Sequence, residues 1–164
     1  MVEGIIVRGY SGFYYVQNGG REWECSLRGR YRIKSQDFLV GDRVVIQPLC
    51  EGRGVIERVL PRKTRLQRPP IANVEQVVVV MALTSPEPDL ILLDRLLVLA
   101  GVEGIKPVIC LNKVDLVSRE VAESYSAIYR NIYPVVITSV KEGTGIQSLK
   151  EILQGTLSVL AGPS

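Results

Sequence analysis

The sequence predicts two domains of different fold class, a small closed β-barrel followed by a mostly parallel α/β sheet. In the first third of the chain, short β-branched and aromatic stretches alternate with glycine-containing turns, whereas the remainder alternates continuous apolar runs with stretches of helical length. The charge distribution divides the chain in the same way, because residues 1–70 hold 13 Lys/Arg against 7 Asp/Glu and residues 71–164 hold 7 against 10. A basic module, suited to a polyanionic partner, is therefore joined to a mildly acidic one.

Five stretches near the N-terminus have the composition of short β-strands. Turn sequences such as Asn18-Gly19-Gly20 and Glu51-Gly52 separate them. Five strands in about 60 residues suit an OB-fold, and an SH3-like barrel is the competing possibility. The expected strands cover residues 3–9, 12–18, 21–28, 42–47 and 54–60.

The segment from Leu60 to Pro70, LPRKTRLQRPP, is basic and bounded by prolines. Proline favours extended backbone in itself and in the residue before it, so we expect a linker that belongs to neither core. The predicted domains are residues 1–68 and residues 69–164.

The second domain is predicted to alternate strands and helices. The run 75–83 is continuous and β-branched, as expected for a strand covered on both faces, and the leucine-rich stretch 89–102 has the length of a helix. This alternation continues to residue 162, which predicts parallel strands with right-handed crossovers. The later expected elements are a strand at 106–113, a helix from its cap Ser118 to Ile132, a strand at 134–139, a helix at 146–153 and a strand at 156–162.

The composition excludes several kinds of site. The chain contains no histidine, which removes Ser-His-Asp and Cys-His mechanisms and any imidazole metal site. Its longest apolar run is far too short to span a membrane and its N-terminus is not a signal peptide, so we expect a cytosolic protein with no membrane partner. The cysteines form no C-x-x-C pair, and we expect all three to be buried thiols: Cys25, Cys50 and Cys110.

The loop Asn112-Lys113-Val114-Asp115 directly follows an apolar strand, where open parallel sheets place their ligand sites. Guanine presents two adjacent donors, N1–H and the N2 amino group, and the Asp115 carboxylate can accept both, whereas adenine has no such donor pair. Asn112 can offer its amide to the acceptor side of the purine, and Lys113 can lay its alkyl stem over the base. The loop therefore predicts guanine recognition, with a chance motif in a helix-capping loop as the alternative.

A second polar loop follows the next strand and contains Ser139, Val140 and Lys141 ahead of Gly143-Thr144-Gly145. Its backbone N–H groups could face the guanine O6. Alternatively, its glycines only end a strand and begin a helix. Because the two loops lie one strand–helix unit apart, coincidence of both is improbable.

The chain contains no G-x-x-x-x-G-K-[ST] segment, which is the usual cradle for the β- and γ-phosphates. The last expected strand leads into Gly162-Pro163-Ser164, and a phosphate loop could begin at Gly162. A frayed tail is the alternative.

Four basic side chains alternate along the barrel domain and would share one face of an extended segment: Arg28, Arg30, Arg32 and Lys34. Aromatic residues lie nearby in sequence: Tyr14, Tyr15, Trp23 and Tyr31. Basic side chains beside aromatic rings suit the phosphates and unpaired bases of RNA, so we expect RNA binding here. The alternative is that the aromatic residues fill the barrel and the arginines form a solvated rim.

At these motifs the chain resembles the ribosome small subunit-dependent GTPase A family, bacterial circularly permuted GTPases that assist maturation of the small ribosomal subunit. The stretches GIIVRGYSGFYYV, CSLRGRYR and LVGDRVVI resemble the family's OB-fold, and PRKTRLQRPPIANVEQVVVV resembles the start of its GTPase domain. The stretch LLDRLLVLAGVEGIKPVICLNKVDLV resembles the region that holds its guanine-specificity motif. In this family the guanine-reading motifs precede the phosphate loop, which is the order seen here.

Carried over by residue, Asn112, Lys113 and Asp115 resemble the base-specificity motif. Ser139, Val140 and Lys141 resemble the supporting loop, although Val140 replaces the usual alanine. Glu75 likewise stands where the family has aspartate, a change we expect to matter little.

The resemblance implies an OB-fold barrel followed by an incomplete, circularly permuted P-loop GTPase-like α/β sheet. It implies that the complete protein hydrolyses GTP with Mg²⁺, binds GTP or GDP and the small ribosomal subunit with its rRNA, and is a cytoplasmic monomer. Zinc is expected only in the family's C-terminal module, and we expect that module to be missing from this chain. We expect the chain to stop at the start of the phosphate loop, to hold no catalytic residue and to be inactive alone.

Two other functions remain open. A non-catalytic RNA-binding protein with an α/β docking domain is the main alternative. A small-molecule α/β enzyme with a chance N-K-x-D sequence is disfavoured by the lack of catalytic constellations.

Overall fold

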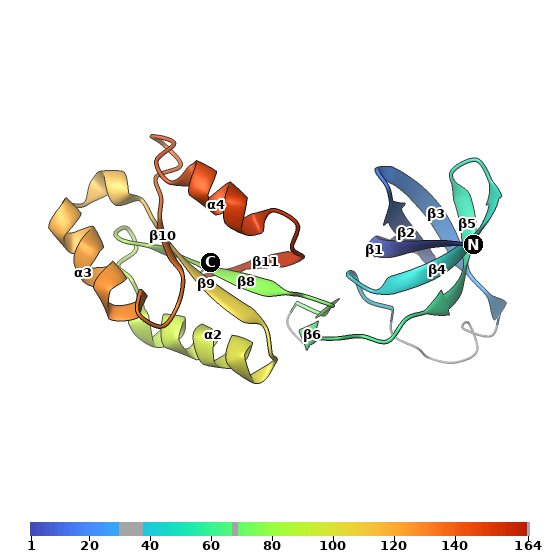
Figure 1. Cartoon of the computed structure of the whole chain (residues 1–164), viewed down its shortest axis with the longest axis horizontal. Coiled ribbons are helices and arrows are strands. Elements are labelled where there is room, and N and C mark those ends of the chain that lie inside the picture. The colour runs from blue at the N-terminus through green and yellow to red at the C-terminus, as the bar shows by residue number, and fades with distance from the viewer. Residues whose placement is uncertain (30–37, 67–68, 164) are drawn as a thin grey trace. The chain divides into compact units, whose positions relative to one another are not determined.

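The computed structural model describes residues 1–29, 38–66 and 69–163, and the chain forms two compact units, residues 1–74 and 75–164 (Figure 1). The division falls after Val74, a few residues beyond the expected boundary at residue 68. Two residues between these positions are hydrogen-bonded to the rest of the first unit. The Ala72 N–H donates to the Val40 carbonyl at 2.8 Å, and the Asn73 side-chain amide donates to the Gly41 carbonyl at 2.9 Å.

The first unit is a closed five-stranded barrel, which confirms the predicted OB-like fold. Its strands pair in the order β1-β2-β3-β5-β4, and β4 pairs with β1 to close the barrel. Strands β3 and β5 are parallel, and the other pairs are antiparallel. The strands are β1 (Val2–Tyr10), β2 (Phe13–Asn18), β3 (Arg21–Leu27), β4 (Arg43–Cys50) and β5 (Arg53–Val59).

Side chains from all five strands fill the barrel with a single apolar cluster. Val16, Cys25 and Ile56 are fully buried there, and Trp23 is 9% exposed. Cys50 corrects our expectation of three buried thiols, because it is exposed at the end of β4, beside a turn and a register shift in the pairing with β5.

Residues 60–66 are attached to the barrel, which corrects our expectation of a linker that belongs to neither core. The Arg62 guanidinium donates to both oxygens of Asp42, from Nε at 2.7 Å and from Nη2 at 2.8 Å. Asp42 is fully buried and also accepts the Leu39 N–H, so the ion pair fastens the segment to the barrel. A short antiparallel ladder of β6 (Arg65–Leu66) and β7 (Ile71–Ala72) follows.

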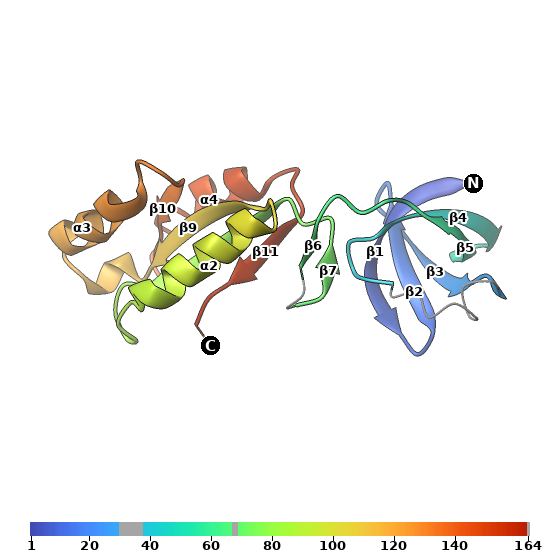
Figure 2. The same ribbon diagram turned by 90° about the horizontal axis from the view of Figure 1, so that it is seen from below.

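The second unit is a four-stranded parallel sheet, as predicted, and its strands lie in the order β10-β9-β8-β11. Helices α2 and α4 cover opposite faces of this sheet (Figures 1 and 2). Its strands are β8 (Gln76–Ala82), β9 (Lys106–Asn112), β10 (Val135–Ile137) and β11 (Ser158–Ala161). Its helices are α2 (Leu90–Val102), the 3-10 helix η1 (Val114–Leu116), α3 (Arg119–Tyr129) and α4 (Ile146–Leu153).

Local sequence explains where these helices begin. The Asp89 carboxylate accepts the Leu92 N–H at 2.9 Å at the start of α2, and the Ser118 hydroxyl accepts the Val121 N–H at the start of α3. Helix α3 ends at Tyr129, three residues before the expected end at Ile132, because the Ile132 N–H turns back to the Tyr129 carbonyl.

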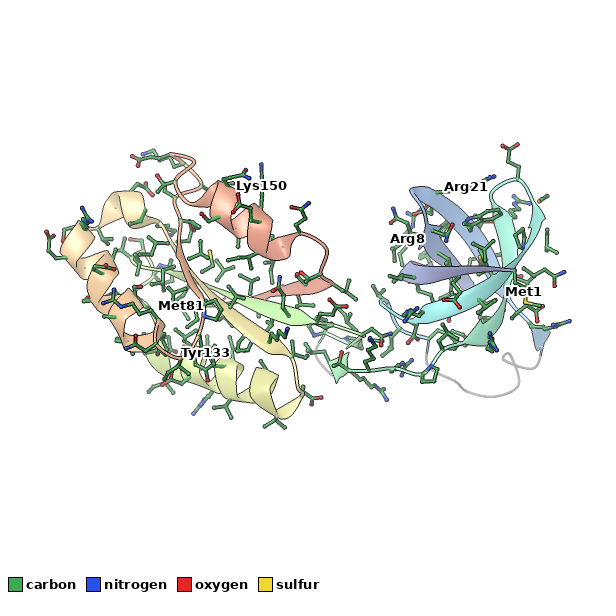
Figure 3. All side chains as sticks on the ribbon, in the orientation of Figure 1. Met1, Arg8, Arg21, Met81, Tyr133 and Lys150 are labelled. Atoms are coloured by element: carbon green, nitrogen blue, oxygen red, sulfur yellow. The ribbon has the colours of Figure 1, made fainter. Side chains whose placement is uncertain are left out.

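Apolar side chains fill the layers on both sides of the sheet (Figure 3). On one face Val78, Val108 and Cys110 pack against Leu149 and Ile152 of α4. Within the described residues, no helix has the length and apolar character needed to cross a membrane.

Candidate guanine-binding site

The two polar loops predicted from the sequence emerge at the same edge of the parallel sheet. Strand β9 ends at Asn112 and its neighbour β10 ends at Ile137, and both strands run in the same direction. Ala82 at the end of β8 is in register with Asn112. The structure therefore gathers the loops after β8, β9 and β10 at the carboxyl ends of the strands, where ligands of such sheets bind.

The backbone of the first loop is fixed on two sides. The Asn112 carbonyl accepts the Leu83 N–H at 2.9 Å, and the Val114 N–H donates to the Thr138 carbonyl at 3.1 Å. Between them, Lys113 adopts the left-handed conformation, with φ of 64° and ψ of 36°. This conformation is uncommon for a residue with a side chain and turns the chain sharply from β9 into η1.

Asp115 joins the two loops directly. The Ser139 hydroxyl donates to Asp115 Oδ1 at 2.6 Å and accepts the Glu142 N–H at 3.1 Å. Ser139 is fully buried, whereas Asp115 is half-buried. The hydroxyl thus holds the carboxylate in one orientation while bracing the second loop.

Asn112 is held by a residue that our sequence reasoning missed. The Thr138 hydroxyl donates to Asn112 Oδ1 at 3.1 Å and also lies 3.3 Å from the Cys110 sulfur. Thr138 is 1% exposed and directly precedes Ser139, so its position at the end of a strand beside a candidate residue was the available signal. Burial raises the pKa of the Cys110 thiol.

Lys113 reaches the third loop at this edge. Its ammonium group donates to the carbonyl of Ser85, which follows β8 and was not a candidate from sequence. The alkyl stem of Lys113 therefore bridges two loops at the carboxyl ends of the strands.

The second loop presents backbone donors. Val140 and Lys141 are exposed, and in the described ranges of the chain their N–H groups donate to no protein acceptor. The loop is closed by the Ser139 N–H, which donates to the Thr144 carbonyl at 3.0 Å. Gly145 has φ of 69°, and a Cβ there would overlap the Ile137 carbonyl, so glycine is required where the loop returns to α4.

Gly162 follows β11, whose last residue, Ala161, is in register with Val79 of β8. A Cβ at Gly162 would overlap the Val80 carbonyl, so the backbone approaches β8 closely here. Among residues 1–29, 38–66 and 69–163, no group of three His, Cys, Asp or Glu side chains is arranged to hold a metal ion.

Three of the four basic residues predicted to bind RNA, Arg30, Arg32 and Lys34, lie outside the described residues, as does Tyr31. The fourth, Arg28, forms an ion pair with Glu57.

The aromatic residues near them have structural contacts. Trp23 belongs to the barrel core, which corrects the idea of an exposed ring there. The Tyr15 ring lies 3.8 Å below the Arg8 guanidinium, and the Tyr14 ring centre lies 5.1 Å from that of Phe38.

Ion pairs neutralise much of the barrel's charge. Every carboxylate in the described part of residues 1–70 contacts an arginine: Glu3–Arg43, Glu22–Arg8, Glu24–Arg53, Asp42–Arg62, Glu51–Arg21 and Glu57–Arg28. Arg58 and Lys63 are exposed and form no ion pair with another described residue. They are basic side chains that sequence reasoning did not single out.

A cavity of about 400 Å³ lies beside the hairpin of β1 and β2. Aromatic side chains of Tyr10, Phe13, Tyr14 and Phe38 contribute to its lining. Tyr10 is 79% exposed and Phe13 46% exposed, so these rings, rather than Trp23, are the most accessible of the barrel's described aromatic residues.

Family models match both units of the chain. The model described as RsgA GTPase matches residues 59–164, and the model described as RsgA N-terminal domain matches residues 3–56. The small ribosomal subunit biogenesis GTPase RsgA of Moorella thermoacetica is 54% identical, covering 99% of this chain and 56% of that protein. The protein of the same name from Alkaliphilus metalliredigens is 45% identical, covering 100% of this chain and 57% of that protein.

Solved structures share the fold. The crystal structure of YjeQ from Thermotoga maritima matches with a TM-score of 0.92 and 39% identity, covering 99% of this chain and 60% of that chain. The structure of YloQ, a circularly permuted GTPase, matches with a TM-score of 0.86 and 37% identity, covering 100% of this chain and 60% of that chain. The chain thus spans little more than half the length of the curated relatives and about three fifths of these structures.

Proposed function

The chain belongs to the RsgA GTPase family, and on that premise we propose that its α/β unit recognises the base of GTP and GDP in a GTP-hydrolysing factor of small ribosomal subunit biogenesis. The observation that carries this proposal is the hydrogen bond from Ser139 to Asp115, which joins the two candidate loops at the carboxyl ends of the strands. The proposed activity belongs to the cytoplasm, where ribosomes are assembled.

Asp115 supplies the selectivity for guanine. Its carboxylate uses one lone pair on the Ser139 hydroxyl and retains acceptor sites for the N1–H and N2 amino donors of the base. Adenine would place an acceptor nitrogen against the same carboxylate, which leaves both groups unpaired. A site of this kind can reject the wrong base by roughly four orders of magnitude.

The other loop residues complete the contacts to the base. The N–H groups of Val140 and Lys141, which have no described protein acceptor, are donors for the guanine O6. Asn112 supplies an amide to the N7 side, and the stem of Lys113, held at Ser85, covers one face of the ring.

Hydrolysis needs groups that these loops do not provide. Mg²⁺ and phosphate-loop amides stabilise the charge on the transferred phosphoryl group in such enzymes, and this sequence has no G-x-x-x-x-G-K-[ST] segment. We propose that Gly162, after β11, corresponds to the start of a phosphate loop. Purified as it stands, the chain should release no phosphate from GTP, and turnover that disappears in Asp115→Asn would contradict this.

The barrel is the proposed contact with RNA. Support comes from the excess of basic residues in positions 1–70, from exposed Arg58 and Lys63, and from the exposed rings of Tyr10 and Phe13. Arg28, Arg30, Arg32 and Lys34 remain part of this proposal. A non-catalytic RNA-binding protein with an α/β docking domain is the second candidate, and it predicts RNA binding without nucleotide selectivity.

Nuclear magnetic resonance titration separates the two candidates, because it detects weak binding residue by residue. With ¹⁵N-labelled chain, GMP should shift the amide signals of residues 112–115 and 139–145. IMP, which lacks the N2 amino group, should bind about fivefold more weakly, and AMP should leave these signals in place. Equal shifts with GMP and AMP, or none with either, would refute guanine recognition and leave the RNA-binding candidate.

A further inference from the structure

Three side chains form a continuous hydrogen-bonded series beneath the candidate site. Cys110 lies in β9, Thr138 directly follows β10, and Asn112 is the last residue of β9. The Cys110 sulfur is 3.3 Å from Thr138 Oγ1, and Thr138 Oγ1 is 3.1 Å from Asn112 Oδ1. Cys110 is 2% exposed and Thr138 is 1% exposed, so water does not compete for these bonds.

The number of protons available determines which group donates in each hydrogen bond of this series. The Thr138 hydroxyl has a single proton, and Asn112 Oδ1 can only accept, so that proton lies between Thr138 and Asn112. The lone pairs of Thr138 Oγ1 then face Cys110, whose thiol is the remaining donor. Because burial raises the pKa of this thiol, it stays protonated near neutral pH and keeps its role as donor.

The direction matters because an asparagine amide has two nearly isosteric orientations, which exchange Oδ1 and Nδ2. Only one of them offers a donor to the acceptor N7 of guanine. The hydrogen bond from Thr138 to Asn112 Oδ1 selects that orientation before the base binds.

We infer that Thr138, supported by the Cys110 thiol, is a positioning residue that fixes the Asn112 amide with Nδ2 toward the base. This inference rests on the proposed guanine recognition and deepens it, since it assigns selectivity for N7 to residues that do not touch the base. A purely structural role for Thr138 would leave the chain's discrimination at N7 unchanged.

The test compares GMP with 7-deaza-GMP, in which a C–H group replaces N7, by nuclear magnetic resonance titration of the whole chain. The unaltered chain should bind GMP about fivefold more tightly than the analogue, which is the size expected for one hydrogen bond. Thr138→Val preserves the shape of the side chain without its hydroxyl, so both nucleotides should bind equally weakly. Thr138→Ser restores the hydroxyl and should restore the ratio.

Ser126→Ala is the matched control, because it removes another buried hydroxyl, from the middle of α3, and should keep the fivefold ratio. Cys110→Ala is the milder variant, since Thr138 keeps its hydroxyl but loses its donor, and the ratio should fall to about twofold. If Thr138→Val does not fold, the ratio of GMP to 7-deaza-GMP affinity in Cys110→Ala tests the inference by itself.

An unchanged ratio in Cys110→Ala, or in folded Thr138→Val, overturns the inference while guanine recognition stands. A different result, in which the unaltered chain binds GMP no better than AMP, removes the proposed function on which the inference rests.

Discussion

The two units of this chain use polar side chains in opposite ways. In the barrel, carboxylates pair with arginines around the surface, and Asp42 is the one described acidic side chain there that is fully buried. In the α/β unit, buried hydroxyls of Thr138 and Ser139 sit at the ends of strands and orient half-buried Asn112 and Asp115. The barrel's pairs stabilise its own surface and fold, whereas those of the α/β unit prepare side chains for a ligand.

This contrast has an energetic basis. Exposed ion pairs such as Arg8–Glu22 contribute roughly 0–1 kcal/mol, because water already solvates both charges. Buried polar groups are costly unless each is bonded, so a buried hydroxyl at a strand end indicates a specific partner. Buried polar side chains are therefore better guides to a site in this protein than surface charge.

The largest expected effect comes from breaking the barrel's buried pair. Asp42→Ala removes the buried carboxylate to which both the Arg62 guanidinium and the Leu39 N–H donate, so the barrel should lose about 3–5 kcal/mol of stability. Urea unfolding followed by Trp23 fluorescence reports on this unit alone, because Trp23 is the chain's single tryptophan. Glu22→Ala, which breaks an exposed pair, should cost less than about 1 kcal/mol. Similar losses in both variants would contradict the contrast.

A smaller effect is expected at the second loop of the α/β unit. Gly145→Ala combines a left-handed backbone with overlap of its Cβ on the Ile137 carbonyl, and should destabilise the unit by about 2 kcal/mol or more. Gly143→Ala is the matched control, because Gly143 also has positive φ but open space around its Cβ, and about 1 kcal/mol is expected. Circular dichroism of the helices during urea unfolding measures both. Equal costs would show that the close approach at Gly145 does not constrain the loop.

The smallest effects are expected from Arg58 and Lys63, which form no ion pair with another described residue. Replacing Arg58 or Lys63 by alanine should weaken RNA binding uniformly across sequences and lower the slope of log K against log salt by about 1 for each. Filter binding of a ribosomal RNA fragment at several salt concentrations provides the measurement. Arg8→Ala, whose guanidinium is engaged by Glu22 and the Tyr15 ring, should change the slope less. An RNA affinity that does not change with salt concentration would contradict the proposed contact between the barrel and RNA.

Local sequence patterns were sufficient for most of the fold. The alternation of β-branched residues and turns located all five barrel strands, and the leucine-rich stretch located α2, because strand and helix periodicity depend on neighbouring residues. The candidate loops could be found for the same reason, since each directly follows an apolar strand.

The remaining features depend on contacts between distant residues. Arg62 and Asp42 lie 20 positions apart. The basic, proline-bounded sequence around Arg62 therefore predicts a linker, because no neighbouring residue indicates the pairing with Asp42. Thr138 and Asn112 lie 26 positions apart and meet only because β9 and β10 are adjacent. Likewise, no periodicity shows that Trp23 fills the barrel while Tyr10 and Phe13 remain exposed.

The most direct test asks whether replacing Asp115 changes the base that the site prefers. Xanthine carries a carbonyl oxygen where guanine has its amino group, so Asp115→Asn, which introduces an amide donor, should exchange the preference of the site. Nuclear magnetic resonance titration of the unaltered chain should show GMP binding about tenfold or more above XMP, and the variant should show the reverse. Glu103→Gln, which removes a charge from an exposed residue at the end of α2, should keep the original preference. A variant Asp115→Asn that still prefers GMP would contradict the central claim that this carboxylate selects guanine.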